Sequence, residues 1–414
     1  MHEVEVIMKY VLGEERKSNR RTVIIGALAA VFVLMIAFIL WLTLVRAPAE
    51  KPKAASVALA AHQEKSEPEY TEVNGRYLMN GTIVTARAVE KWSKRADGST
   101  DWARPYSALN TFQPELYDDW IADFECPSLD IVIPYQIQVD LLQFNCRPEF
   151  VTEAAKHFSV FNLANNHSGD KGRDGFEKTR AVLATNNIQA HGHYDPSVKE
   201  DICEVVGLQV RLKKPDGSEQ KATMPIAFCA WHYFGRTPRE GEIEHMTQYS
   251  KIMPVFAFVH MGQEYLTTAT PIQVDIAHRV IDAGADFVIA NNPHWVQNSE
   301  VYKGKLITYS TGNFIFDQID AEGMRSVSID VAMNMQYNQN IAKWLALGES
   351  CKKLHDECFA QALSQGLTRP DFKLSYSPVA GDNSGRLTKR GSAALQKAIE
   401  ERTNWTATSK ELGQ

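Results

Sequence analysis

The sequence predicts an α/β sandwich, and three observations support this fold class. Short apolar runs rich in β-branched and aromatic residues recur along the chain, and each ends abruptly in a polar cluster. Segments with helical periodicity lie between these runs. Runs that are apolar on both faces are typical of strands buried within a sheet. Alternating strands and helices then indicate a layered α/β domain.

The expected elements can be placed in order. The strands are expected at 76–79, 120–122, 158–163, 255–259, 287–290 and 306–309, and helical patterns lie at 149–157, 175–185 and 271–283. Every expected strand has its polar cluster at its carboxyl end, which is where α/β proteins usually keep their chemistry. We therefore expect one shared site at that edge.

Composition limits the class of function. The 414 residues suffice for one large domain or two ordinary ones. They are 44% hydrophobic and 23% charged, close to the average of soluble proteins. The formal net charge of −6 argues against a nucleic-acid partner, because general nucleic-acid binders carry a strong basic excess. The net charge does not exclude a local basic patch, for instance around Lys91, Lys94 and Arg95.

Residues 22–45 predict a transmembrane helix. They read TVIIGALAAVFVLMIAFILWLTLV, 24 residues without a charge, and a bilayer core needs roughly 20. Basic residues bias the amino terminus toward the cytoplasm: Arg16, Lys17, Arg20 and Arg21 before the segment, and Arg46, Lys51 and Lys53 after it. A signal peptide has a shorter apolar region of ~7–15 residues. It remains an alternative, as does a buried core helix.

The predicted organisation is a single-pass protein of the cell membrane with its main domain outside. It comprises a cytoplasmic amino terminus (1–21), the transmembrane helix (22–45), an extracellular linker (46–73), the main domain (74–335) and a helical or irregular extension (336–414). The linker mixes Ala, Pro, Lys and Glu without an apolar period, which is typical of a tether.

The six cysteines lack CxxC spacing, so a zinc ribbon is not expected. In an exterior domain they can form disulfides. The pairs that are close in sequence are Cys126 with Cys146 and Cys351 with Cys358. Spacing does not decide the pairing, and buried free thiols are the alternative.

Five residues of metal-ligand type stand near the ends of predicted strands. They are Glu125, Asn166, His167, His260 and His294. Carboxylate and imidazole groups are good ligands for divalent ions, and an asparagine carbonyl is a weaker oxygen donor. A single histidine at a strand end is more often a packing residue. Five such residues in equivalent positions predict one polar site.

Several stretches resemble, in order and spacing, the CapA-type proteins of bacterial poly-γ-glutamate capsule synthesis. They are GTIVTARAVEKW (81–92), DFECP (123–127), LANNHSGDKG (163–172), HMGQEY (260–265), GADFVIANNPHWVQNSEVYKG (284–304) and ITYSTGNFIFDQ (307–318). The resemblance implies a calcineurin-like metallophosphatase fold, a four-layer sandwich of two packed β-sheets flanked by helices, with a potential two-metal site in strand-end loops.

The resemblance also implies partners. These are an ATP-dependent γ-glutamyl ligase, a small membrane subunit of the capsule synthase complex, and the poly-γ-glutamate polymer. The chain has no GxxxxGK[ST] phosphate loop, so we do not expect it to activate glutamate itself.

The sequence lacks ligand residues of the family pattern in two motifs. Where the family's first motif has an aspartate ligand, this chain has Thr82, and the family's Gly-His-His-Pro-His reads Ala-Asn-Asn-Pro-His here, with Asn291 and Asn292 in place of histidines. His167 matches the family's candidate acid or transition-state stabiliser. The positions that keep the family's ligand types are Glu125, Asn166, His260 and His294.

These departures predict a degraded metal site. A two-metal hydrolase clamps the reacting oxygens between ions ~3.5–4 Å apart, which requires a bridging anionic ligand and several imidazoles. We expect no cofactor, or at most one divalent cation such as Mg²⁺, Ca²⁺ or Mn²⁺. A working site would need substitute carboxylates such as Asp123 or Asp170.

Three functional hypotheses remain. In the first, the protein is a non-catalytic component of capsule synthesis and export whose cleft holds the anionic polymer or a partner. The cleft residues are Thr82, Glu125, Asn166, Asn291, Asn292 and His294. In the second, it is a metal-dependent hydrolase of a phosphoester, or of an amide bond in the polymer or cell wall. In the third, it is a surface protein with an unrelated partner.

Overall fold

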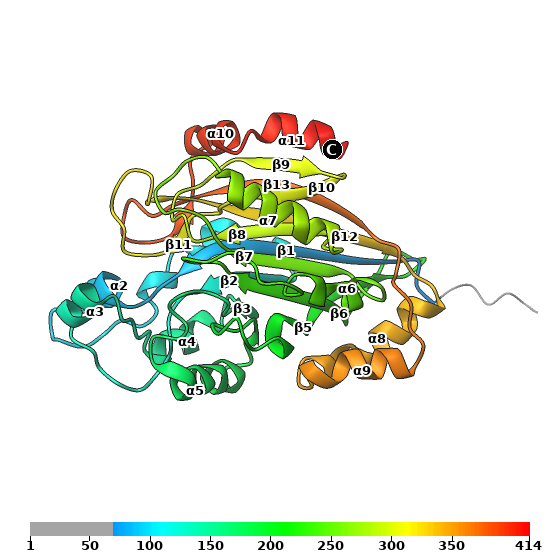
Figure 1. The fold of residues 1–414 in the computed structure, drawn as a ribbon, viewed down its shortest axis with the longest axis horizontal. Helices are drawn as coiled ribbons and strands as arrows, with labels where there is room; N and C mark the ends of the chain where they lie inside the picture. The colour runs from blue at the N-terminus through cyan, green and yellow to red at the C-terminus, as the bar shows by residue number, and fades with distance from the viewer. Residues whose placement is uncertain (1–68) are drawn as a thin grey trace, which may run out of the picture. The chain divides into compact units, whose positions relative to one another are not determined.

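The computed structural model describes residues 69–414, and Glu67–Gln414 form one compact unit. This unit has a mixed α/β, sheet-rich fold (Figure 1). Among residues 69–414, none of the helices is long and apolar enough to cross a membrane. The predicted transmembrane segment, 22–45, lies outside the described residues, as do the predicted cytoplasmic segment and most of the linker.

The elements are as follows. The strands are β1 (Glu72–Ile83), β2 (Asp119–Phe124), β3 (Val160–Asn162), β4 (Gln189–His191), β5 (Cys203–Lys213), β6 (Glu219–His232), β7 (Val255–His260), β8 (Phe287–Asn291), β9 (Ser299–Tyr302), β10 (Lys305–Thr308), β11 (Asn313–Ile315), β12 (Arg325–Gln336), β13 (Lys373–Asp382) and β14 (Lys389–Arg390). The helices are α2 (Arg87–Trp92), α3 (Tyr135–Leu141), α4 (Pro148–Ala154), α5 (Gly172–Thr185), α6 (Thr247–Ser250), α7 (Pro271–Asp282), α8 (Gln339–Cys351), α9 (His355–Ser364), α10 (Ala393–Arg402) and α11 (Trp405–Leu412). Each strand and helix expected from the sequence overlaps one of these elements.

The strands form one hydrogen-bonded network that branches at β1. The main path runs β14-β13-β12-β1-β5-β6-β7-β8-β10-β9, and a second path leads from β1 through β2 and β3 to β4. Two hydrophobic clusters fill the interior, one around β5 to β8 and the other around β2, β3 and α4. The two branches of this one network are therefore joined through β1.

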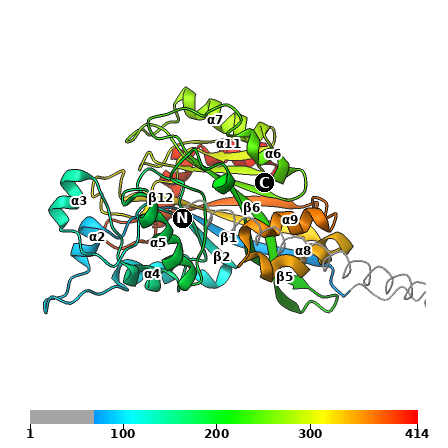
Figure 2. The ribbon, with the colours of Figure 1, turned by 60° about the horizontal axis from the view of Figure 1, so that its bottom comes forward.

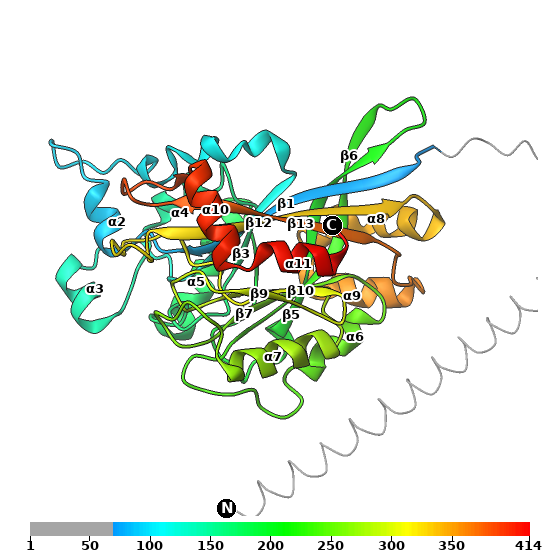
Figure 3. The ribbon, with the colours of Figure 1, turned by 90° about the horizontal axis from the view of Figure 1, so that it is seen from above.

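Helices lie on both sides of this network. Figure 1 shows α10 and α11 above the strands and α4, α5, α8 and α9 below them. The view in Figure 2 brings the lower helices forward, and the view from above in Figure 3 brings α10 and α11 forward. In all three views α2 and α3 lie side by side at one end of the compact unit.

Parallel pairing brings the polar strand ends together. In β1 and β2, Thr82 lies opposite Asp123, and in β2 and β3 Asp123 lies opposite Asn162. In β7 and β8, which α7 connects, His260 lies opposite Asn291. Parallel neighbours need such a crossover, which returns the chain to the same edge. The polar clusters after these strands consequently share one end of the sheet.

The carboxyl-terminal segment differs from the expected helical or irregular extension. It contributes β13, which pairs with β12 from Arg325 opposite Asp382 to Asn334 opposite Lys373. The sequence KLSYSPVAGD does not predict a strand, because it contains a proline and prolines in sheets are confined to edges and bulges. Glutamines near the chain end cover the open edge: Gln396 accepts from the Ala380 amide and Gln414 from the Tyr376 amide, each at 2.9 Å.

All six cysteines are paired. Disulfides join Cys126 to Cys146 and Cys351 to Cys358, the two pairs close in sequence, and Cys203 to Cys229. The third pair could not be read from spacing, because only the register of β5 and β6 places Cys203 opposite Cys229.

Candidate functional site

Asp123, at the end of β2, is the centre of the polar cluster. The residue is fully buried. Its Oδ1 accepts hydrogen bonds from the side-chain amides of Asn162 and Asn165, each at 3.0 Å. Its Oδ2 lies 3.0 Å from His260 Nδ1, and the Thr82 hydroxyl donates to it at 3.4 Å. One carboxylate therefore orders side chains from β1, β3 and β7.

His260 is held between this carboxylate and two further oxygens. Its Nε2 lies 2.8 Å from Asn166 Oδ1 and 3.5 Å from Glu125 Oε1. With Nδ1–H donating to Asp123, Nε2 would present a lone pair to two oxygen acceptors. A proton on Nε2 relieves this conflict, and so does a cation that Nε2 and the oxygens share. A carboxylate behind an imidazole is the arrangement that orients histidine ligands of metals.

The residues present offer ligands for one divalent ion rather than for a bridged pair of metals. Glu125, Asn166 and His260 offer a carboxylate, an amide oxygen and an imidazole, which suit a single ion with water as additional ligands. The buried Glu125 Oε2 has no hydrogen-bond partner among the described residues. Within residues 69–414, no three His, Cys, Asp or Glu side chains group in a way that would by themselves hold a metal. An ion at His260 would therefore depend on the Asn166 amide.

The site is acidic. Burial raises the pKa of Glu125 well above its ordinary value, and the negative charges of Asp123, Glu264 and Asp170 raise this pKa further. Arg87 opposes this shift, but its guanidinium forms an ion pair with Asp317 and packs over the Phe144 and Phe316 rings. The arrangement thus favours a proton or a cation near Glu125.

His167 lies beside this cluster and has its own carboxylate. Its Nδ1 is 3.1 Å from Asp170 Oδ2, and its ring stacks on Phe144 with the centroids 4.1 Å apart. The Phe144 amide also donates to Asp170 Oδ2, at 2.6 Å. The imidazole is therefore fixed in orientation, as an acid or base group requires.

His294 is held at a second place along the same edge. Its Nδ1 lies 2.9 Å from Asn313 Oδ1, and its Nε2 is 3.7 Å from Glu264 Oε1. The hydrogen bond from His294 lowers the pKa of Glu264. Both His294 (φ 61°) and Asn292 (φ 99°) have positive φ angles, a conformation that is uncommon outside glycine and often found at functional sites.

The two asparagines that replace histidines make structural contacts. The Asn291 amide oxygen accepts a hydrogen bond from the Thr311 hydroxyl, and the Asn292 amide donates to the Gly262 carbonyl at 2.6 Å. These bonds connect the end of β8 and the residue after it to the loops that follow β7 and β10. Both asparagines are buried.

The structure thus assembles some predicted site residues and separates others. Glu125, Asn166 and His260 form one group, while His167 and His294 each have a different carboxylate partner. Sequence reasoning gave Asp123 only a substitute role and missed Asn162, Asn165 and Asn313 as partners. Parallel pairing of β1, β2 and β3 aligns Thr82, Asp123 and Asn162, so it is the signal that could have identified Asn162.

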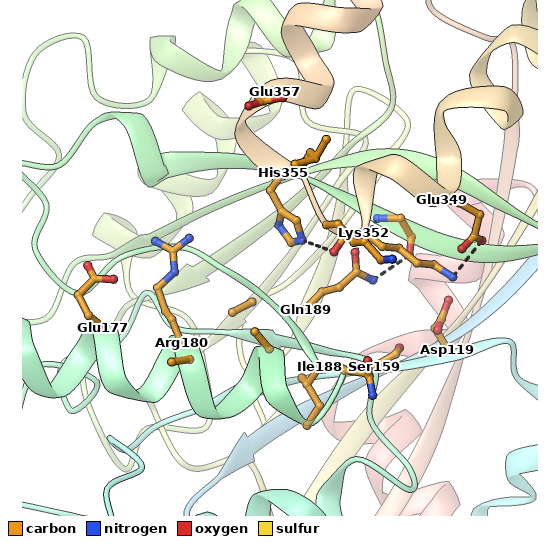
Figure 4. Close-up of a pocket in the computed structure, with 17 residues that line it drawn as sticks. Asp119, Ser159, Glu177, Arg180, Ile188, Gln189, Glu349, Lys352, His355 and Glu357 are labelled. Atoms are coloured by element: carbon orange, nitrogen blue, oxygen red, sulfur yellow. Dashed lines mark hydrogen bonds and ion pairs between the residues drawn. The ribbon is translucent and has the colours of Figure 1, made fainter.

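A separate pocket lies at the other end of β2. It has a volume of about 1100 Å³ and is lined by residues from α5, β4 and the turn between α8 and α9 (Figure 4). Lysine and arginine side chains face carboxylates around it, and Lys352 pairs with Glu349 at 3.3 Å. Asp119 lies in its wall, and burial raises the pKa of this carboxyl to about 6. The mixture of charges favours no single class of ligand.

The fold and the strand-end cluster define an α/β protein with a buried, acidic site, consistent with a metallophosphatase-like domain. A family model described as bacterial capsule synthesis protein PGA_cap matches residues 76–318. The chain belongs to this family, and the predicted CapA-type resemblance is confirmed.

Individual relatives agree with this assignment. The chain is 27% identical over 336 residues to the PGA biosynthesis protein CapA of Bacillus subtilis (strain 168), covering 76% of this chain and 77% of that protein. It is 25% identical over 340 residues to the capsule biosynthesis protein CapA of Bacillus anthracis, covering 76% and 72%. A probable polyglutamine synthesis accessory protein of Mycobacterium tuberculosis is 26% identical over 171 residues, covering 38% and 45%.

A crystal structure of a hypothetical protein from Thermus thermophilus is similar at 13% sequence identity and a TM-score of 0.37. The match covers 74% of this chain and 99% of that chain, and it is too distant to inform function.

Proposed function

We propose that this protein is a membrane-anchored component of poly-γ-glutamate capsule synthesis and export. In this proposal it acts with an ATP-dependent γ-glutamyl ligase and a small membrane subunit, and its strand-end site binds one divalent cation that helps to hold the anionic polymer. The family assignment and the CapA relatives support the process. The geometry around His260 supports the cation.

A cation is needed because the site itself would repel the polymer. Asp123, Glu125, Asp170 and Glu264 contribute carboxylates, and the nearby Arg87 is engaged by Asp317. Like charges at short range in a buried setting disfavour a bound polyanion. A divalent ion held by Glu125, Asn166 and His260 would offset part of this negative charge and leave coordination positions for oxygens of the ligand.

The observation that carries the proposal is the position of His260 Nε2 between two oxygens, at 2.8 Å and 3.5 Å. Asp123 fixes the opposite ring nitrogen, so the ring cannot turn away from Asn166 without losing that bond. Asp123 has four donors around it, which leaves it poorly suited to bridge two ions. The site accordingly supports ligand binding better than two-metal hydrolysis.

The metal assignment can be tested by titrating the purified protein with Mn²⁺, Mg²⁺ and Ca²⁺ in a calorimeter. One ion per chain is expected, with affinity reduced roughly tenfold or more in Glu125→Gln, because a charged ligand is lost. Glu115→Gln, an exposed carboxylate away from the cluster, should bind like the wild type. No binding by the folded wild-type protein would contradict the cation proposal.

The cellular role can be tested by deleting the gene and complementing with variants. γ-Linked glutamate polymer should disappear on deletion, return with the wild type and with Glu115→Gln, and remain low with Glu125→Gln and His260→Ala. Unchanged polymer after deletion would refute the capsule role. Full complementation by Glu125→Gln and by His260→Ala would show that the strand-end cluster is not required for polymer synthesis.

The anchor and partners need their own test. Protease added to intact cells should cleave the main domain only if it is outside, and removal of 22–45 should release the protein from membranes. Affinity purification of the full chain should recover the ligase and the small membrane subunit. A cytoplasmic domain would contradict the proposed topology.

A metal-dependent hydrolase is the second candidate, and the pair formed by His167 and Asp170 favours it. A carboxylate-oriented imidazole beside the cation site could act as a general acid or base. The purified protein should then shorten poly-γ-glutamate or cleave a generic phosphodiester in the presence of Mn²⁺, and His167→Ala should abolish this activity without changing ion affinity. Absence of turnover with bound metal would exclude this candidate for the substrates tested.

A further inference from the structure

Residues 127–145 form a lobe that exposes apolar side chains. The lobe contains α3 and lies between Cys126 and Cys146, which are joined by a disulfide. Of the fourteen large apolar side chains exposed among residues 69–414, seven lie between 131 and 142. Val132 is 72% exposed and Leu141 61% exposed. Monomeric proteins rarely show such dense apolar exposure unless the surface binds something.

Helix α3 exposes six of its seven residues, and four of the six are apolar or aromatic. Its one buried residue is Gln138, which is 2% exposed, whereas Tyr135, Ile137, Val139 and Leu141 face outward. A helix at a protein surface normally buries its apolar side and exposes its polar side. The apolar side chains of α3 therefore face away from the core of this domain.

Buried polar side chains hold the backbone of the lobe in place. Asn145, which is buried, donates to the carbonyls of Leu129 and Ile131 and accepts from the Leu129 amide. Gln138 donates to the Ile133 carbonyl and accepts from the Asn145 amide. The buried polar residues thus fix the backbone, and the apolar residues are left to the outside.

We propose that this lobe is a membrane-docking element that inserts its apolar side chains into the lipid interface. The exposed side chains are mostly aliphatic, whereas protein interfaces centre on Trp, Tyr and Arg anchors. α3 lies at one end of the compact unit in Figures 1, 2 and 3, so its outer surface is free of other described elements. A protruding aliphatic surface suits a soft lipid surface better than a shaped protein groove.

The residues beside the lobe suit lipid headgroups. Lys91 in α2 is exposed, and its Nζ lies 5.0 Å from the centre of the Tyr135 ring. Lys94 and Arg95 follow it just after the end of α2. Tyrosine and lysine are characteristic of the membrane interface, where lysine is attracted to anionic lipids. Lys91 therefore lies next to the apolar lobe, whereas Lys94 pairs with Glu90 at 3.9 Å and Arg95 with Asp101 at 3.2 Å.

Acidic residues moderate this attraction. Asp130 pairs with Arg147 at 3.0 Å, and Asp140 accepts from Gln136 at 2.7 Å. We therefore expect binding to depend mainly on apolar insertion and only weakly on salt. The proposal relies on the proposed anchor only to bring the domain near the bilayer.

The test uses Glu67–Gln414, which is a compact unit with its own cores and disulfides. Omitting the anchor separates lobe binding from anchoring, so a failure here leaves the proposed capsule role intact. The domain is sedimented with vesicles of phosphatidylglycerol and phosphatidylethanolamine, with and without high salt. Val132→Ser combined with Leu141→Ser should lower the partition coefficient at least about tenfold, since burial of each aliphatic side chain contributes on that scale.

The matched control is Ile272→Ser combined with Leu363→Ser, which changes two exposed aliphatic side chains on α7 and α9. It should bind vesicles like the wild type, and all variants should keep the same thermal midpoint. Absence of vesicle binding, or equal binding by both double variants, would overturn the proposal. A third outcome would also overturn the proposal: the domain dimerises but does not bind vesicles, and Val132→Ser with Leu141→Ser abolishes the dimer. The lobe would then be a contact between two copies of the chain.

Discussion

Removing the carboxylate of Asp123 tests whether this residue organises the site. In Asp123→Ala, the side-chain amides of Asn162 and Asn165 and the Nδ1 of His260 each lose a hydrogen-bond partner at 3.0 Å. All four of these residues are buried. A buried polar group left without a partner costs about 1–3 kcal/mol, so three such groups should lower the free energy of unfolding by at least about 3 kcal/mol.

Asp123→Asn is the variant to compare with Asp123→Ala. The asparagine can keep its oxygen toward Asn162 and Asn165, and its amide can donate to a His260 ring whose proton has moved from Nδ1 to Nε2. The number of hydrogen bonds is then preserved, and we expect less than half of the loss seen with alanine. Asp101→Ala, which removes a more exposed carboxylate paired with Arg95, should leave the unfolding midpoint unchanged.

The assay is guanidinium unfolding of Glu67–Gln414 followed by tryptophan fluorescence, with the disulfides intact. If Asp123→Ala unfolds at the wild-type midpoint, the hydrogen bonds around Asp123 do not contribute as argued. If Asp123→Asn lowers the free energy of unfolding as much as Asp123→Ala does, the hydrogen bonds that Oδ1 accepts from Asn162 and Asn165 are not the source of the stabilisation.

Three further predictions use the same unfolding assay. Replacing Cys126 and Cys146 together by serine should cost about 3 kcal/mol, because the disulfide closes a loop with a sequence separation of 20; an unchanged midpoint would refute this. Burial raises the pKa of Asp119 from an ordinary 3.8 to about 6, so the folded chain keeps a proton that the unfolded chain has lost, and stability should fall by about 3 kcal/mol as pH rises through that interval. Asp119→Asn should lack this component, and an identical pH profile would contradict the assignment. Thr270→Ala should cost about 1 kcal/mol, because Thr270 and Gln273 form a capping box at the start of α7, and equal helix stability in the variant would argue against it.

Much of the fold could be predicted because local pattern and tertiary context agree. The strands at 255–259 and 287–290 are apolar on both faces, and the helix at 271–283 begins at a threonine followed by proline. These signals depend on neighbours in sequence. Strand β13 could not be predicted in the same way, because its pairing with β12 is long-range and Pro378 disguises its pattern.

The same distinction applies to the candidate site. The sequence predicted Glu125, Asn166 and His260 as site residues from residue type and position after strands, and the structure brings these three side chains together. It could not show that Asp123 would be the residue that orders them, because this depends on parallel register between β1, β2 and β3. Nor could it show that Asn291 and Asn292 would bond to neighbouring loops.

The sequence by itself determined the family, the alternation of strands and helices, and the edge at which polar residues gather, because periodicity and residue order encode these properties. Only the tertiary structure decided which side chains meet and which face of a segment is covered. Residues 131–142 show this most clearly: an apolar run such as IVIPYQIQVDLL would suit a buried core equally well. Its exposure follows from Asn145 and Gln138, whose buried amides hold the backbone and turn the apolar side chains outward.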